Sequence, residues 1–252
     1  MLGEGLFETC LVEAGDIQHL CAHLTRLKQG ADHLGIAWPS VDIASLCHQV
    51  IAANHLLTTT CALRITLTQT STQRGLISTS SAPDVVISAY PYTPPELDHT
   101  ITGCTTTPYC INDRSPLCAF KTSNYLESIQ AKRHARQNGF DEALLFNTQD
   151  RLCCTTIGNV FLYRNQELLT PCTQEGALPG VIRRQLLTHT ATTNLRIRTT
   201  SITRHDCLEA DVLFHTNSLI GIQSFSSLDG RQLQRLPCEI ESTLRQHLLL
   251  KH

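Results

Sequence analysis

The sequence lacks the features that mark membrane, secreted and metal-binding proteins. No apolar run approaches the roughly 20 residues of a membrane span. Residues 1–5 lack the basic start and apolar core of a secretory signal. The 12 cysteines include no C-x-x-C pair and the 12 histidines no H-E-x-x-H motif, so we expect free thiols and no metal site. These absences predict a cytoplasmic protein with no membrane partner.

The sequence also lacks a strong charge of either sign. Lysine and arginine total 20 against 22 for aspartate and glutamate, which leaves a formal net charge of -2. The densest basic cluster, Lys132, Arg133 and Arg136, is typical of a solvated helix face, so we expect no nucleic-acid partner. G-x-S-x-G and Walker motifs are missing, and the lone G-x-G at residues 3–5 has no strand before it. A dinucleotide site is therefore not expected.

What remains is the pattern of a mixed α+β globular protein. Hydrophobic residues make up 41% of the chain, an ordinary globular share. Strands and helices are mixed without strict alternation, which favours an α+β fold in two domains. We expect a small N-terminal domain over 1–95, a linker over 96–116 and a larger C-terminal domain over 117–252. Periodicity predicts strands over 7–14, 61–68, 85–92, 141–147, 160–163, 167–169, 195–202 and 212–216, and helices over 17–35, 40–54 with Ser40 as N-cap, 123–137, from the 178–180 turn to about 188, and 238–250.

Seven short segments carry the functional information. They are GLFET at Gly5–Thr9, HLTRL at His23–Leu27, FKTSNY at Phe120–Tyr125, DEALL at Asp141–Leu145, GNVF at Gly158–Phe161, LPGVIR at Leu178–Arg183 and TNSL at Thr216–Leu219. Each segment is weak evidence alone. In this order and at these intervals they resemble the class IV aminotransferases, which are the fold-type IV pyridoxal 5'-phosphate enzymes. The resemblance runs from Gly3 to about Gly230.

The resemblance implies a cofactor, a catalytic residue and an architecture. The cofactor is pyridoxal 5'-phosphate, and Lys121 is the lysine that binds it covalently and later acts as general base at the substrate Cα. The implied fold has a small N-terminal α/β domain and a larger cofactor-binding C-terminal domain with a barrel-like sheet. The family habit also implies a homodimer and a small-molecule, amino-acid-like substrate.

The resemblance further implies how the cofactor phosphate is held. A phosphate dianion favours an arginine and the N–H groups of a helix N-terminus. The family arginine carries over to Arg26, for which the alternative is a solvated helical residue. The turn before the predicted helix supplies the backbone of Val181 and Ile182, although the family commonly has a threonine at Ile182. A second phosphate-binding turn matches Asn217 and Ser218.

Two departures from the family stand out. Cys154 occupies the position of the glutamate that pairs with the cofactor's ring nitrogen, and the sequence places no acid close to it. A neutral thiol cannot hold a pyridinium as a carboxylate does, so the electron sink is weakened. The chain also begins at the G-x-G segment, where family members have a preceding strand. We expect either a start upstream of Met1 or a small domain without an edge strand.

The choice within the family favours a lyase. The lysine motif lacks the extra glycine of the branched-chain enzymes, and residues 89–94 lack the arginine and histidine with which D-amino-acid enzymes hold the substrate carboxylate. The resemblance therefore implies an aminodeoxychorismate lyase, which forms 4-aminobenzoate and pyruvate from 4-amino-4-deoxychorismate for folate synthesis. An aminotransferase acting on branched-chain or D-amino acids, and a catalytically degraded homologue, remain alternatives.

Overall fold

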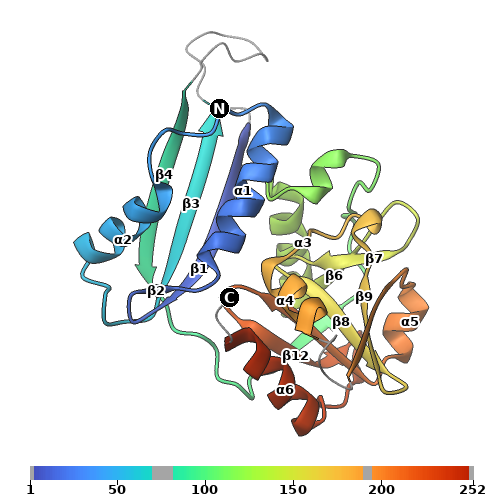
Figure 1. Cartoon of the computed structure of the whole chain (residues 1–252). Coiled ribbons are helices and arrows are strands. Elements are labelled where there is room, and N and C mark those ends of the chain that lie inside the picture. The colour runs from blue at the N-terminus through green and yellow to red at the C-terminus, as the bar shows by residue number, and fades with distance from the viewer. Residues whose placement is uncertain (1–2, 70–81, 190–194, 250–252) are drawn as a thin grey trace. The chain divides into compact units, whose positions relative to one another are not determined.

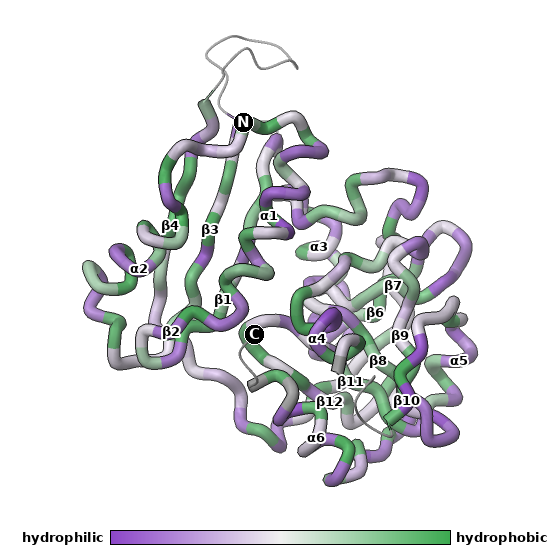
Figure 2. Tube along the Cα trace, in the orientation of Figure 1, coloured by the Kyte–Doolittle hydropathy of each residue, from purple (hydrophilic) through white to green (hydrophobic). Residues whose placement is uncertain are grey.

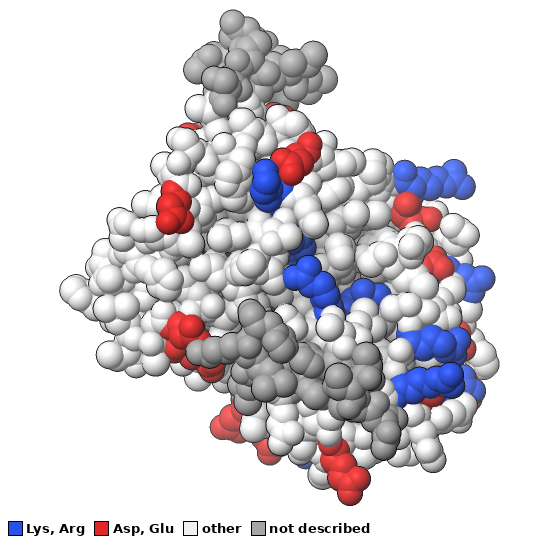
Figure 3. All heavy atoms as spheres, in the orientation of Figure 1, with Lys and Arg blue, Asp and Glu red and all other residues white. Residues whose placement is uncertain are grey.

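In a computed structural model, the chain forms two units, and each unit is described by itself. The structure describes residues 3–69, 82–189 and 195–249. Unit 1 runs to Pro94 and also includes Phe120–Asn124, whereas unit 2 comprises Pro95–Ala119 and Tyr125–Leu250. No helix within the described ranges is long and apolar enough to cross a bilayer. Figure 3 shows acidic and basic side chains in scattered groups on the face drawn there.

Unit 1 is an antiparallel sheet with two helices on one face (Figure 1). Alternation along β3 produces this arrangement, because Leu63, Ile65 and Leu67 are buried against the helices while Arg64 is exposed on the other face. The predicted strand at this position is confirmed. The sheet order is β2-β1-β3-β4, with β1 (Gly5–Glu13), β2 (Asp16–Ile17), β3 (Cys61–Gln69) and β4 (Pro83–Pro91), and the helices are α1 (Leu20–Leu34) and α2 (Ile43–Ala53).

Helix α2 begins later than the sequence predicted. Its N-cap is Asp42, whose side chain accepts a hydrogen bond from the Ser45 N–H at 3.2 Å. The prediction of Ser40 as the cap is therefore wrong. Both residue types favour N-caps, but the helix begins at Ile43, so the cap position falls on Asp42 and not on Ser40.

Unit 2 is built on one strongly curled sheet of nine strands. The order is β10-β9-β8-β11-β12-β5-β6-β7, with β13 paired to β12. Although the order ends at β7, this strand also contacts β8 and β9, so the sheet closes toward a barrel. The strands are β5 (Ile101–Cys104), β6 (Glu142–Phe146), β7 (Leu152–Thr155), β8 (Asn159–Arg164), β9 (Glu167–Pro171), β10 (Arg196–Thr200), β11 (Val212–Asn217), β12 (Gly221–Leu228) and β13 (Arg231–Gln232).

Strand β8 is buried on both faces, which explains its uninterrupted apolar run. Val160 and Leu162 pack into the interior of the curled sheet. Phe161 points to the outer face, where its ring stacks on Phe214 at 5.1 Å beneath α4 and α6. Figure 2 shows the hydrophobic colouring along β8. The helices of unit 2 are α3 (Leu126–Gln137), α4 (Val181–His189), α5 (Arg204–Glu209) and α6 (Cys238–Leu249), with single 3-10 turns at Pro116–Ala119 and Thr173–Glu175.

The predicted α+β class is confirmed, but several elements differ from the prediction. Strands β2, β7, β12 and β13 and helix α5 were not predicted. β7 has four residues and α5 has six, too few for a clear period, and the register of β12 shifts between Phe225 and Ser227. Helix α3 starts at Leu126 rather than Ser123 because the residues before it are extended and pair with β1.

Replacing Asp42 with alanine tests the cap assignment. Asp42→Ala removes an acceptor for the Ser45 N–H and should lower the free energy of unfolding by about 1 kcal/mol. Ser40→Ala, at an exposed position two residues earlier, serves as the matched control and should leave stability unchanged. Urea denaturation of both variants measures the difference. Equal losses, or a loss confined to Ser40→Ala, would contradict the assignment.

Candidate active site

Lys121 is fixed to unit 1 by a short antiparallel pairing with β1. The Phe7 N–H donates to the Lys121 carbonyl at 2.9 Å, and the Ser123 N–H donates to the Gly5 carbonyl at 2.8 Å. Gly5 permits this approach, because a Cβ there would lie 3.0 Å from the Ser123 Oγ and 2.9 Å from a Thr68 methyl group. The backbone that carries Lys121 is therefore part of the sheet.

The Lys121 side chain lies over an aromatic ring on the same face of the sheet. Its Nζ is 4.2 Å from the centroid of the Phe7 ring, and the guanidinium carbon of Arg64 is 3.9 Å from the same centroid. Both contacts are cation–π interactions, which orient a cation without neutralising it. Arg64 was not predicted as a site residue. Only the pairing of β1 with β3, which sets Thr9 opposite Arg64, brings it near Lys121.

A buried carboxylate on β1 organises the predicted phosphate-contacting segment. Glu8 accepts hydrogen bonds from Arg26 Nε at 2.7 Å and Nη2 at 2.6 Å, and its Oε2 lies 2.7 Å from His23 Nδ1. Glu8 is 1% exposed and Arg26 is 11% exposed. Burial raises the pKa of Glu8, but the hydrogen bonds from Arg26 and His23 outweigh it and the pKa is lowered. Arg26 is therefore not a solvated helical residue.

These charges set the protonation of Lys121. Burial first, and then the positive charge of Arg26, lower the pKa of Lys121 to about 8, with Glu8 opposing and Arg64 adding to the decrease. An amine with that pKa is about one-tenth neutral at pH 7, whereas an ordinary lysine is almost wholly protonated. The neutral amine is the form that attacks a carbonyl. A neutral Lys121 amine is therefore accessible near neutral pH, and its role as the nucleophile stays a prediction.

In unit 2, Cys154 lies on β7 opposite Leu145 of β6. Part of its surface remains accessible, yet burial of the thiol by the surrounding protein, with a contribution from the charge of Glu142, raises the pKa of Cys154 to about 12. The thiol is neutral at pH 7. It can accept or donate a weak hydrogen bond but provides no negative charge.

Glu142 is the acid that the sequence did not place near Cys154. Its side chain is fully buried, and Lys132 Nζ donates to its Oε2 at 2.7 Å. Its other oxygen accepts from the Ala143 N–H at 2.9 Å and from both the hydroxyl and the N–H of Thr156. This carboxylate has a cationic partner and three further hydrogen-bond donors, two of which belong to Thr156 in the turn after β7. It does not replace the missing family glutamate.

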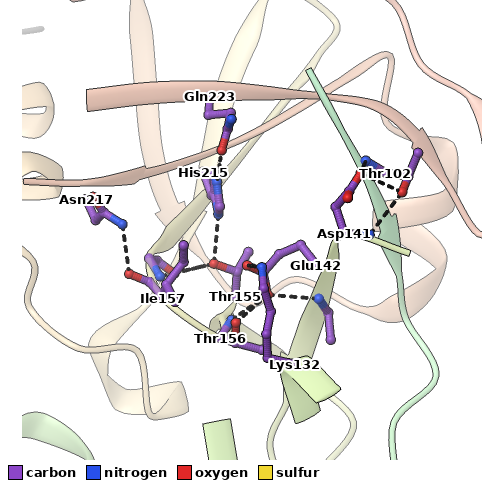
Figure 4. Close-up of polar contacts among 12 residues, drawn as sticks. Thr102, Lys132, Asp141, Glu142, Thr155, Thr156, Ile157, His215, Asn217 and Gln223 are labelled. Atoms are coloured by element: carbon purple, nitrogen blue, oxygen red, sulfur yellow. Dashed lines mark hydrogen bonds and ion pairs between the residues drawn. The ribbon is translucent and has the colours of Figure 1, made fainter. Parts of the chain in front are cut away.

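The turn between β7 and β8 is held from two further sides (Figure 4). Thr155 Oγ1 lies 2.9 Å from Nδ1 of His215, and Nε2 of His215 lies 3.1 Å from the amide oxygen of Gln223. Since the amide oxygen can only accept, Nε2 of His215 carries the proton in this contact. Asn217 donates to the Ile157 carbonyl at 3.3 Å. The predicted phosphate turn at Asn217 is therefore tied to the segment that follows Cys154.

The other predicted phosphate turn is held by the residue that begins β8. Asn159 donates through Nδ2 to the Leu178 carbonyl at 2.8 Å. A Cβ on Gly180 would meet the Asn159 Oδ1 at 1.9 Å, so only glycine fits this turn. Helix α4 starts immediately afterwards with Val181 and Ile182, both buried. The first N–H groups of a helix have no internal acceptor and favour an anion.

Two buried donors next to these turns have no hydrogen-bond partner within the described residues. They are Nε of Arg183, beside Ile182, and the hydroxyl of Thr216, beside Asn217. Across the turn that Asn217 begins, its side-chain oxygen accepts from the N–H groups of Leu219 and Ile220 at 2.9 and 3.0 Å. The N–H groups of that turn are therefore already engaged, and the helix start together with the two orphaned donors forms the donor set that fits a phosphate dianion.

The seven residues predicted from the sequence fall into two groups. Lys121 and Arg26 lie in unit 1, where each influences the charge of the other. The remaining five lie in unit 2, around the turns that follow β7 and β11 and the start of α4. The unit 2 residues are Cys154, Val181, Ile182, Asn217 and Ser218.

Comparison with known proteins gives consistent matches. A sequence model of the family described as amino-transferase class IV matches residues 5–228. The aminodeoxychorismate lyase of Vibrio harveyi is 25% identical over 90% of this chain and 84% of its own length. A solved structure from Legionella pneumophila, provisionally named a 4-amino-4-deoxychorismate lyase, is 30% identical with a TM-score of 0.90 over 98% of this chain and 92% of that one.

Proteins with other names share the same fold. The branched-chain amino acid aminotransferase of Escherichia coli is 22% identical and superposes with a TM-score of 0.87 over 97% of this chain and 84% of that one. At this identity the likeness speaks for the fold alone. The structural neighbours together confirm the predicted architecture of a small α/β domain and a larger domain with a barrel-like sheet.

Titration of Lys121 tests the charge arrangement in unit 1. In the cofactor-free protein, Lys121 should titrate near pH 8. Arg64→Met removes a positive neighbour and should raise this pKa, most clearly at low ionic strength. The rate of trinitrophenylation of Lys121 as a function of pH, followed by peptide mass spectrometry, measures both values. Arg133→Met, an exposed arginine of unit 2, is the control and should change nothing. A Lys121 that titrates near 10.5 would contradict the arrangement.

Proposed function

The chain belongs to the class IV aminotransferase family, and on that premise we propose that it is a pyridoxal 5'-phosphate lyase that converts 4-amino-4-deoxychorismate to 4-aminobenzoate and pyruvate. The family is dependent on this cofactor. When bound, the cofactor supplies an electron sink for the carbon that bears the substrate's amino group. Lys121 would hold it covalently, and Cys154 would face its ring nitrogen. Arg26, the N–H groups at Val181 and Ile182, and the turn at Asn217 and Ser218 would hold its phosphate.

The observation that best supports the proposal is the position and the lowered pKa of Lys121. Its backbone is part of the β1 sheet, and its amine has a pKa of about 8 because it is buried beside Arg26. Such an amine can act as nucleophile and can also accept a proton near neutral pH. Its Nζ would take the proton from the carbon that bears the amino group. Arg64, exposed on the same face, would provide a positive charge for a substrate carboxylate.

The neutral Cys154 supports a lyase over an aminotransferase. In the proposed reaction, loss of the proton is coupled to breaking of the C–O bond between the ring and the enolpyruvyl group, which leaves as enolpyruvate and takes up a proton to become pyruvate, and the remaining ring becomes aromatic. Aromatisation drives this step, so a weakened electron sink is tolerated. Transamination has no such driving force and depends on the sink throughout. The relative named aminodeoxychorismate lyase, which this chain matches over most of its length, supports the same choice.

An aminotransferase and a catalytically degraded homologue are the alternatives. A sequence relative from Methanocaldococcus jannaschii that is provisionally named a branched-chain-amino-acid aminotransferase supports the first, and the neutral thiol at Cys154 supports the second. Each predicts a different product pattern. An aminotransferase consumes a 2-oxo acid and forms the matching amino acid, whereas a degraded homologue turns over neither kind of substrate.

The test is product analysis with the purified, cofactor-loaded chain. With 4-amino-4-deoxychorismate we expect 4-aminobenzoate and pyruvate in equal amounts, measured by fluorescence and by coupled lactate dehydrogenase. Lys121→Ala should reduce turnover by about 10²- to 10⁴-fold. Borohydride treatment followed by peptide mapping should place the cofactor on Lys121. Transfer of the amino group to a 2-oxo acid without pyruvate release would support the aminotransferase, and a cofactor adduct on another lysine would refute the site.

Substitution of Cys154 by glutamate tests its position at the ring nitrogen. A carboxylate there favours the protonated form of the nitrogen and should raise its pKa. The nitrogen-15 chemical shift of cofactor labelled at the ring nitrogen reports this directly. Cys154→Gln, with the same shape and no charge, is the control and should leave the shift at its native value. If glutamate and glutamine give the same shift in folded, cofactor-loaded protein, then Cys154 does not face the ring.

A further inference from the structure

Arg183 is a buried cation that has no charged partner among the residues that the structure describes. It is the third residue of α4 and is 6% exposed. Its only hydrogen bond within the described residues runs from Nη2 to the Pro171 carbonyl at 2.9 Å, and its Nε has no partner. No carboxylate in the described part of the chain forms an ion pair with it. The neighbouring Arg184, by contrast, is exposed.

This isolation sets Arg183 apart from the other buried charges of the protein. Glu8 is matched by Arg26, and Glu142 is matched by Lys132. A buried charge without compensation is costly, so proteins pair such groups or bind a counter-ion. Burial lowers the pKa of Arg183, which indicates the same cost. An arginine nevertheless remains charged at neutral pH. A compensating negative charge from outside the chain would remove the imbalance.

The location of Arg183 says where such a charge would bind. Side chains of an α-helix lean toward its N-terminus, so Arg183 leans over the first turn of α4. Its bond to Pro171 holds the guanidinium at the end of β9, where Thr170 Oγ1 donates to the Val160 carbonyl at 2.8 Å. Val160 directly follows Asn159, the residue that holds the turn before α4.

We propose that Arg183 is the buried counter-charge of the cofactor phosphate. The proposal rests on the proposed cofactor and goes beyond it, because it assigns the charge balance at the start of α4 to a residue other than those that the family resemblance implies. The N–H groups of the helix would contact the phosphate, and Arg183 would supply the unit charge that makes a dianion preferable to a neutral group. The orphaned hydroxyl of Thr216 is a further donor at the neighbouring turn.

The affinity ratio of two probes tests the proposal. The full chain, stripped of cofactor, is titrated with pyridoxal 5'-phosphate and with pyridoxal, which lacks the phosphate. Arg183→Met should weaken the first affinity by about 10- to 100-fold, as expected for the loss of a charge-assisted interaction, and leave the second unchanged. Arg184→Met is the matched control from the same helix turn and should preserve both affinities. Arg183→Lys keeps the charge and should retain part of the preference for pyridoxal 5'-phosphate over pyridoxal.

Thermal unfolding without cofactor provides the second measurement. Removing an uncompensated buried charge should raise the melting temperature of Arg183→Met in phosphate-free buffer and abolish the further rise that inorganic phosphate gives the native chain. If the methionine variant does not fold, Arg183→Gln takes its place. An unchanged affinity ratio, or an unchanged response to inorganic phosphate, would overturn the role of Arg183 alone. A native chain that binds neither probe would overturn the proposed function and this inference together.

Discussion

The pairing of residues 121–123 with β1 is the constraint on which the proposed chemistry depends. Two backbone hydrogen bonds make Lys121 an extension of the sheet, so its side chain emerges on the same face as Phe7 and close to Arg64. The adjacent residue on β1, Glu8, points the other way and binds Arg26 of α1. A single strand thus positions the nucleophile on one face and the charge that tunes it on the other.

Charge balance in the interior divides the residues of the site into two kinds. Glu8 and Glu142 are satisfied within the chain by cations and by backbone or hydroxyl donors. The hydrogen bonds of these two carboxylates form without a ligand, and they fix the geometry of the surrounding turns. Within the described ranges, Nε of Arg183 and the hydroxyl of Thr216 are buried donors without a hydrogen-bond partner. In a protein of marginal stability such groups are tolerated mainly where binding compensates for them.

The sequence allowed the local parts of this arrangement to be predicted, and not the parts that depend on register. The strand at β3 and the helix after Gly180 follow from short-range patterns and are found where expected, whereas the role of Lys121 comes from the family resemblance and stays a prediction. The proximity of Glu142 to Cys154 and of Arg64 to Phe7 depends on which strands pair and in which register, which no local period encodes. Similarly, the choice between Ser40 and Asp42 as N-cap depends on where the chain turns into α2.

The route of the chain also has a consequence for how the protein acquires its structure. Unit 1 takes its last strand-like segment, 120–124, from a stretch that follows the first part of unit 2. This closure joins positions more than a hundred residues apart, and long-range closures of this kind are slow steps in folding. During synthesis, β1 would leave the ribosome with an unpaired edge and keep it until that stretch emerged. The segment that carries Lys121 would thus be the last to cover an edge at which other chains could pair.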